Sequence, residues 1–572
     1  MWNFLIVFNP IIEYIKTFNE SQGYELGEIK VITTPFADDF NLISKNKQTH
    51  QKLIKEIQEK AESMGFFLKS SKCRSLSICS GQVQDVTFVI KDYSNDELKV
   101  PIETVHNRPH KFLGSQITYS NTPQEYFKHF QEVLKTKLEN IEESKVRGEY
   151  KLSIYERYAL PSMRFHFSIH DMHQSHLEKL DMLSQTYLKK WLNYPKRGVT
   201  NVGLFHPYLL NVKQPSQMYL EGHTSNLMLM TLKGDQTVKA CIESKLKRES
   251  KWKKKSSSIV KSKRIIVDLV AKNKIQIPTS QTTLQQNIKI AKVAIKKSIQ
   301  EQTKEAWNER VQRLTMQGDF TNLLIEEESS VMWQSMIRRM PRNVLSFATR
   351  LCTNSLNSPD NLVRWGKKRI GSCPLCSSTS GTLAHIVNFC PIALKQGRYT
   401  WRHDSVLLHT TKMMKSLATE NTEVFSDLEG YRVNGTTIPA DILVSVGKGS
   451  RPDLVLLDRK KKVIALLELT VPLPRNTQAA NTRKVNTYTP LEIALRERGY
   501  KVHLVPFEIC SNGHVSKRNK QNIENVLRKF NMRLKVKLLK DLSQISLLCT
   551  MAVFYAYQVT DWVDPPLLSP LD

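Results

Sequence analysis

Two short apolar runs with a polar turn between them place the strongest constraint on this sequence. The first run, 454–457, follows Asp453, and the second run, 463–471, contains one acid, Glu468. Leu-rich and β-branched runs that a charged turn connects predict a buried hairpin. If the hairpin folds about the junction of residues 460 and 461, Asp453 lies across from Glu468, because both are equally far from the turn. The sequence therefore predicts two carboxylates at one place on a sheet.

Two facing carboxylates need a positive charge nearby. Cross-strand partners have Cβ atoms roughly 4.5–5.5 Å apart, and at about 4 Å and an effective dielectric near 20 their repulsion is about 4 kcal/mol. A divalent cation removes this repulsion, and oxygen ligands suit Mg²⁺ or Mn²⁺. A helix is predicted over 478–487, followed by Tyr488, and Lys484 lies four residues before that tyrosine on roughly the same face.

An acid pair, a lysine and a metal ion can cleave a phosphodiester. The metal activates water and neutralises developing charge, while the lysine holds water or phosphate. The alternative is an ordinary hairpin in which a single buried acid pairs with Lys or Arg. A strand over 438–443 adds Asp441 as a possible further acid, a second helix is expected from Pro490 to a C′ glycine, Gly499, and a third strand is expected over 501–508.

Three blocks of this region resemble the restriction-like endonuclease of the site-specific LINE-type (non-LTR) retrotransposons, a member of the PD-(D/E)xK nuclease class. The blocks are Arg451-Pro452-Asp453-Leu454, the segment Leu467–Pro472, and Arg483-Lys484 with Tyr488. The resemblance implies catalysis by the acid pair and Lys484, with Tyr488 orienting them. The broader class has a lysine where this chain has Thr470, so the resemblance assigns that role to Lys484.

The second half of the chain contains three cysteines and a histidine with the spacing of a zinc site. Cys373 and Cys376 are followed after eight residues by His385 and after four more by Cys390. A CxxC turn places two thiolates on one metal, and the other two residues complete a tetrahedron. All four positions are filled, so the sequence predicts a structural Zn²⁺, whose binding energy of about 10–16 kcal/mol can fold a small unit.

The formal net charge of +30 points to a polyanionic partner, which favours nucleic acid over a membrane surface. Composition is that of a folded chain, with 40% hydrophobic and 24% charged residues. Nine cysteines in 572 residues do not form a disulfide scaffold, so a reducing compartment is expected. The apolar segment 545–556 is too short to span a membrane, and Lys263-Arg264 is compatible with nuclear import.

The N-terminal region contains Phe36-Ala37-Asp38-Asp39, which predicts a hairpin tip that holds metal. It is followed by a helix over 48–64, by Lys72, and by Lys111-Phe112-Leu113-Gly114 before a short strand. This order resembles the palm of a reverse transcriptase. The resemblance implies that Asp38 and Asp39 hold catalytic Mg²⁺ and that Lys72 lies near the phosphates of the incoming nucleotide. Asp38 is the first aspartate of the chain, so we expect a palm truncated before its other carboxylate, with doubtful polymerase activity.

Basic residues outside these motifs are candidates for contact with nucleic acid. The segment 245–264 holds ten Lys or Arg and one acid, which is a solvated, mobile segment or a phosphate-tracking linker. Its candidate residues are Lys253, Lys254, Lys255, Lys263 and Arg264, and the segment after the zinc motif adds Arg398 and Arg402. His403, next to them, is expected to be structural rather than a metal ligand.

These predictions combine into a multidomain α+β chain that resembles a non-LTR retrotransposon polyprotein. The expected order is a partial palm (1–120), a helical thumb (121–232), a basic helical linker (233–366), a CCHC zinc knuckle (367–404), an α/β PD-(D/E)xK nuclease (405–540) and a C-terminal tail (541–572). The resemblance implies nicking of target DNA and reverse transcription of a template RNA from the nick. The alternative is a catalytically dead relic that binds nucleic acid. The oligomeric state, the target site and the RNA do not follow from the sequence.

Overall fold

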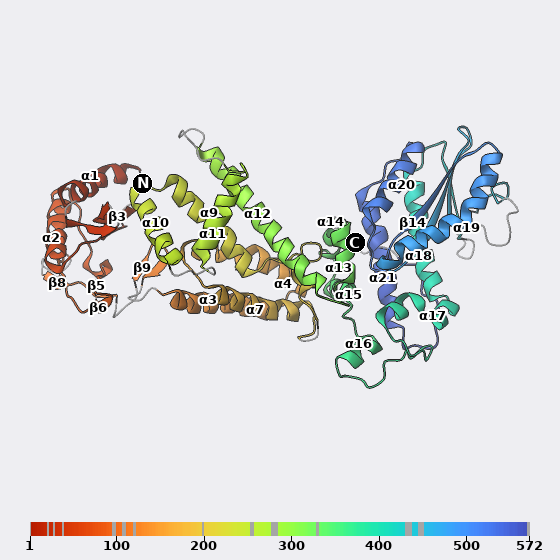
Figure 1. The fold of residues 1–572 in the computed structure, drawn as a ribbon, viewed down its shortest axis with the longest axis horizontal. Coiled ribbons are helices and arrows are strands. Elements are labelled where there is room, and N and C mark those ends of the chain that lie inside the picture. Colours follow the sequence, from red (N-terminus) through yellow and green to blue (C-terminus); the bar gives the residue numbers. More distant parts are fainter. Residues whose placement is uncertain are drawn as a thin grey trace. The chain divides into compact units, whose positions relative to one another are not determined.

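The protein forms two units in its computed structural model (Figure 1). One unit consists of residues 1–139, 157–183 and 215–301, and the other of residues 140–156, 184–214 and 302–572. The structure describes residues 2–19, 22–26, 29–36, 39–93, 99–105, 110–117, 122–196, 199–251, 257–275, 284–327, 331–428, 437–443 and 451–568.

The N-terminal part of the first unit consists of two helices and a series of two-stranded antiparallel hairpins. The helix predicted over 48–64 is present, and the four residues expected on its apolar face, Leu53, Ile54, Ile57 and Ala61, are buried. Leu53, Ile57 and Ala61 share a core with Ile11 and Ile15 of the first helix, whereas Ile54 packs in a separate core with Phe88 and Ile90. The elements are α1 (Trp2–Asn19), β1 (Tyr24–Leu26), β2 (Ile29–Val31), β3 (Thr33–Phe36), β4 (Asp39–Leu42), α2 (Lys47–Ser63), β5 (Ser77–Cys79), β6 (Gln82–Gln84), β7 (Val89–Lys91), β8 (Lys99–Pro101), β9 (His110–Phe112) and β10 (Ser115–Ile117).

The elements that the structure describes between residues 123 and 364 are helices, as predicted. Residues 121–232, which we expected to form one thumb, are divided between the two units. The helices are α3 (Pro123–Glu143), α4 (Gly148–Ile154), α5 (Leu160–Ser162), α6 (Arg164–Ile169), α7 (Gln174–Trp191), α8 (Val202–Phe205), α9 (Pro215–Lys233), α10 (Gln236–Lys251), α11 (Ser258–Ala271), α12 (Leu284–Gln312), α13 (Asp319–Glu326), α14 (Val331–Ile337), α15 (Arg342–Cys352) and α16 (Pro359–Arg364).

A four-stranded sheet forms the centre of the C-terminal region, with the strand order β11-β12-β13-β14. β12 is antiparallel to both of its neighbours, β11 and β13, and β14 is parallel to β13. Every residue of β12 and β13 is buried, which is why both strands appear in the sequence as continuous apolar runs. The elements are α17 (Pro391–Lys395), α18 (Arg398–Leu417), β11 (Glu423–Ser426), β12 (Leu454–Asp458), β13 (Val463–Thr470), α19 (Thr477–Glu497), β14 (Lys501–Glu508), α20 (Lys517–Lys529) and α21 (Val536–Tyr555).

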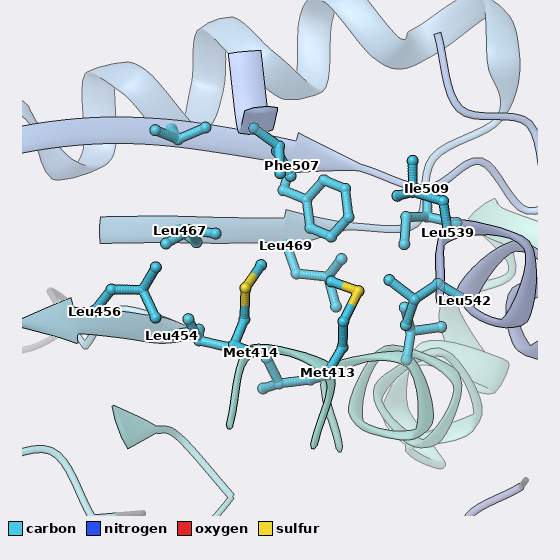
Figure 2. Packing of buried hydrophobic residues seen from close by; sticks show 14 of the residues in the cluster. Met413, Met414, Leu454, Leu456, Leu467, Leu469, Phe507, Ile509, Leu539 and Leu542 are labelled. Carbon is cyan, nitrogen blue, oxygen red and sulfur yellow. The ribbon is translucent and has the colours of Figure 1, made fainter. Parts of the chain in front are cut away.

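The two faces of this sheet bury different helices. Leu454, Leu467 and Phe507 face a core that includes Met414 of α18 and Leu542 of α21 (Figure 2). The alternate residues of the same strands face a second core, in which α19 contributes most of the helical side chains. Because successive side chains of a strand point to opposite faces, this alternation fixes the face on which each residue of the hairpin lies.

Helix α21 belongs to this core. It is the one helix, among the residues that the structure describes, long and apolar enough to cross a membrane, and 61% of that apolar stretch is buried inside the protein. Its buried residues include Leu539 and Ile545. We predicted a domain boundary between residues 540 and 541, where a C-terminal tail would begin. This boundary is wrong, because both residues lie within one continuous helix. The boundary between 404 and 405 likewise falls inside α18.

Two local predictions in the C-terminal region are also wrong. Residues 438–443 form a turn, not a strand, and the edge strand is β11 instead. Pro490 does not begin a new helix, because α19 continues through it to Glu497. Buried Leu491 and Leu495 continue the apolar face of α19 beyond the proline, and this packing offsets the hydrogen bond that proline removes. Gly499 ends the helix with φ +85, as expected of a C′ glycine.

Candidate active site and metal centre

The predicted hairpin register is confirmed. Leu454 pairs with Leu467 and Asp458 with Val463, so Asp453 and Glu468 are next to each other at the open end of β12 and β13. Lys484, from α19, bridges them. Its Nζ lies 2.7 Å from Oδ2 of Asp453 and 3.0 Å from Oε2 of Glu468.

Burial and charge act on the three groups in different directions. Glu468 is 0% exposed, and burial together with the charge of Asp453 raises its pKa well above the usual value. Burial also acts to raise the pKa of Asp453, but His403 and Lys484 outweigh it and lower that pKa to about 2. Burial acts to lower the pKa of Lys484, and the two acids outweigh it and raise that pKa. The lysine therefore places a positive charge between the two acids.

Tyr488 lies one helical turn after Lys484 and is buried. Its hydroxyl donates a hydrogen bond of 2.7 Å to the main-chain carbonyl of Arg451, and the Lys484 Nζ lies 5.5 Å from the centre of its ring. Burial, together with the nearby charges of Glu468 and Asp453, raises the pKa of this phenol. Tyr488 thus holds the backbone two residues before Asp453 and provides an aromatic face for the ammonium group.

His403 is a member of this cluster that the sequence did not reveal. Its Nε2 lies 3.6 Å from Oδ1 of Asp453 and 3.3 Å from the carbonyl oxygen of Leu469, and its Nδ1 lies 3.0 Å from Oδ1 of Asp404. All of these partners are acceptors, so both ring nitrogens carry hydrogen and the ring is a cation. Burial acts to lower the pKa of His403, but Asp404 and Asp453 raise it to about 10.

The donor set at this cluster fits a hard divalent cation. Oε1 of Glu468 is buried and has no hydrogen-bond partner within the described residues, although a buried polar atom normally has one. The Asp453 carboxylate is beside it, and carboxylate oxygens are the ligands that Mg²⁺ and Mn²⁺ take. An ion bound to both acids would satisfy the unpaired oxygen.

The four residues with zinc spacing also come together. The ligand atoms of Cys373, Cys376, His385 and Cys390 all lie within 4.8 Å of one another, and Sγ of Cys376 lies 3.2 Å from Nε2 of His385. Zinc bonds of about 2.0–2.3 Å in a tetrahedron keep ligand atoms roughly 3.4–3.8 Å apart. The cluster therefore fits a closed, structural zinc site with no position left for a catalytic water.

Arg398 and Arg402 were predicted to contact nucleic acid, and this prediction is wrong. Their exposed fractions are 0% and 2%. Arg398 donates to two main-chain carbonyls at and beyond the end of α21. Arg402 donates to the carbonyl of Val387, in the zinc-binding segment, at 2.8 Å and to that of Val471 at 3.4 Å. Both arginines therefore connect structural elements, since the face of α18 that carries them is turned inward.

The residues predicted for the polymerase site and for the basic run lie outside the acid pair and the zinc cluster. β3 and β4 form the expected hairpin, with Phe36 paired to Asp39, and Asp39 is exposed, whereas Asp38 lies outside the described residues. Lys72 is exposed at the end of a short 3₁₀ turn. Of the basic run, Lys263 and Arg264 are exposed on α11, and Lys253, Lys254 and Lys255 lie outside the described residues.

Two segments of the chain match known protein families, and they contain the β3–β4 hairpin and the zinc cluster. Residues 3–117 match the reverse transcriptase (RNA-dependent DNA polymerase) family, and residues 302–396 match the family described as zinc-binding in reverse transcriptase. The second match contains all four residues of the zinc cluster. None of the curated proteins matches this chain.

Together these matches support a reverse transcriptase protein of the retrotransposon type. The first match supports an RNA-directed DNA polymerase enzyme, which implies a nucleic-acid template and divalent metal ions. The second match and the Cys/His cluster indicate zinc as a further metal.

Proposed function

We propose that the region around the four-stranded sheet is a metal-dependent DNA endonuclease of the PD-(D/E)xK, restriction-like class. In this proposal the protein belongs to the LINE-type retrotransposon branch and nicks target DNA, and its reverse transcriptase copies a template RNA from the nick. The reaction requires access to chromosomal DNA, so the proposed location is the nucleus. The observation that carries the proposal is the contact of one lysine, Lys484, with both Asp453 and Glu468.

The chemistry follows from what each side chain can hold. Asp453 and Glu468 would hold a Mg²⁺ or Mn²⁺ ion, which supplies charge stabilisation and a more acidic water when bound. Lys484 would then orient that water or a phosphate oxygen with its ammonium group. Tyr488 would keep the Asp453 strand in place through its hydrogen bond to the main chain at residue 451.

A cleft at the first turns of α19 supports a polyanionic substrate. It has a volume of about 570 Å³, and its lining includes the basic residues Arg475, Lys517 and Arg518 and the acids Glu327 and Glu508. Asn481, which also lines it, lies three residues before Lys484 on α19, so the two side chains are neighbours on the helix surface. Exposed basic groups attract phosphates and release counterions, and this cleft can lead a DNA strand toward the acids.

A nicking assay on supercoiled DNA tests the proposal. Wild-type protein with Mg²⁺ should convert the plasmid to the open circle, and Asp453→Ala should lower the rate at least about a hundredfold because a metal ligand is lost. Asp441→Ala is the matched control, since Asp441 is exposed and pairs with Arg459. If both wild type and Asp453→Ala nick DNA at the same measurable rate, the proposal is overturned. If neither nicks DNA, a relic that binds nucleic acid without cleaving it is favoured.

A further inference from the structure

His403 contacts the acid pair from an element that none of the predicted catalytic motifs includes. Lys484 approaches Oδ2 of Asp453 from α19, whereas His403 approaches Oδ1 from α18. The two helices pack on opposite faces of the sheet. The Asp453 carboxylate is therefore held at both of its oxygens by side chains from two separate helices.

We propose that His403 is a positioning residue for Asp453, which keeps the carboxylate in the orientation that binds a divalent metal ion. This inference rests on the proposed nuclease function. At 3.6 Å the contact of Nε2 with Oδ1 is longer than a hydrogen bond, so the ring attracts the carboxylate mainly through its charge. The N–H group itself donates to the carbonyl of Leu469, the residue that follows Glu468.

The surroundings of the ring keep it in place. Asp404 accepts from Nδ1 at 3.0 Å, which fixes the orientation of the imidazole. The preceding residue, Arg402, is buried and donates to the carbonyls of Val387 and Val471, and this anchors α18 against the end of β13. Side chains that orient a metal ligand in this way commonly change metal affinity or activity by about 10–100-fold when they are removed.

A purely structural role for His403 makes a different prediction. Through its hydrogen bond to Leu469, His403 also connects α18 to β13. If that connection were its only role, its loss would lower the free energy of unfolding and leave the metal affinity of the folded protein unchanged. Metal affinity therefore separates the two roles.

The experiment compares the full-length protein with His403→Ala and with the matched control His409→Ala. His409 lies on the same helix, partly buried, and its Nδ1 has no hydrogen-bond partner within the described residues. Mn²⁺ affinity is measured by titration calorimetry without DNA, and kcat and KM are measured in the nicking assay. We expect His403→Ala to weaken Mn²⁺ binding and to lower kcat about 10–100-fold with little change in KM, while His409→Ala behaves as wild type. His403→Gln, which retains an N–H donor but not the charge, should keep the connection to the carbonyl of Leu469 without recovering the Mn²⁺ affinity.

The outcomes separate this inference from the nuclease proposal. If Asp453→Ala is inactive and His403→Ala binds Mn²⁺ and nicks as the wild type does, the positioning role is overturned and the nuclease stands. If Asp453→Ala nicks as fast as the wild type, both proposals fall. If His403→Ala does not fold, His403→Leu, which keeps most of the side-chain volume without a donor, is interpreted in its place and by the same criteria.

Discussion

Ionisable side chains at the acid pair make stability depend on pH in opposite ways. The pKa of Glu468 is raised by burial, so the folded state binds more protons, and this residue lowers the free energy of unfolding as pH rises above about 4.3. Asp453 has a pKa lowered to about 2, so its contribution is present above about pH 4 and is lost as pH falls toward 2. His403, with a pKa of about 10, contributes stability that is complete below about pH 6.5 and is lost as pH rises to about 10.

The contribution of His403 predicts a measurable difference at high pH. Between about pH 6 and pH 10 the wild type should lose more unfolding free energy than His403→Gln, because glutamine has no proton to lose in this range. Denaturant unfolding at several pH values, without Mg²⁺ or Mn²⁺ and with Zn²⁺ retained, measures how the free energy of unfolding of each protein changes with pH. Parallel pH profiles for the two proteins would contradict a charged His403.

Substitution of a buried arginine should lower stability, whereas substitution of an exposed arginine should weaken DNA binding. Arg402→Ala leaves the buried carbonyl of Val387 without its side-chain donor, whereas the carbonyl of Val471 keeps its hydrogen bond from Asn388. We expect the variant to lower the free energy of unfolding by about 1–3 kcal/mol. Arg518 is exposed at the cleft that Arg475 and Lys517 also line, so Arg518→Ala should change stability by less than about 0.5 kcal/mol and weaken DNA binding severalfold. Thermal unfolding and a DNA-binding titration test both variants. A stable Arg402→Ala protein with weakened DNA binding would restore the original assignment of that residue.

At the scale of secondary structure, α19 shows how tertiary packing overrides a helix-breaking residue. Pro490 lies in the interior of the helix, exposed to solvent, where proline costs about 3 kcal/mol relative to alanine. Leu491 and Leu495, which are fully buried against the sheet, hold the second half of the helix in line with the half that carries Lys484.

Replacement of this proline should stabilise the protein. Pro490→Ala restores a donor to the helix, and we expect the free energy of unfolding to rise by about 1–3 kcal/mol. Thr489→Ala, at the neighbouring position, is the control for a change of side chain alone. A fall in thermal stability for Pro490→Ala would show that the proline is required for the geometry of α19.

At the scale of the molecule, the zinc-binding segment is joined to the sheet that carries the acid pair. Asn388 donates a hydrogen bond of 2.9 Å to the carbonyl of Val471, three residues after Glu468. Arg402 bonds both Val387 and Val471. The metal centre and the candidate active site are therefore parts of one structure within the second unit.

Removal of zinc should consequently affect the distant acid pair. We expect one zinc ion per chain by mass spectrometry, and none in Cys376→Ser. The variant should unfold at lower temperature and lose at least about tenfold in nicking rate, because the segment that supports β13 loses its metal. Cys241→Ser is the control, since Cys241 is exposed and outside the cluster. Full nicking activity in a zinc-free protein would contradict the connection.

What the sequence determined by itself was local. The zinc cluster follows from a CxxC turn and two nearby ligands, and the pairing of Asp453 with Glu468 follows from the short turn between their strands, which fixes the register. The hairpin of β3 and β4 and the apolar face of α2 were predicted for the same reason, since each depends on residues close together in the chain.

Only the tertiary structure decided which faces of the helices are buried. His403 precedes Asp453 by 50 residues, and no periodic pattern reveals that α18 brings them together. The same helix turns Arg398 and Arg402 inward, although arginines are usually exposed, because main-chain carbonyls from distant segments accept hydrogen bonds from their guanidinium groups. These features depend on which surfaces pack against each other, and that is set by contacts between residues far apart in the sequence.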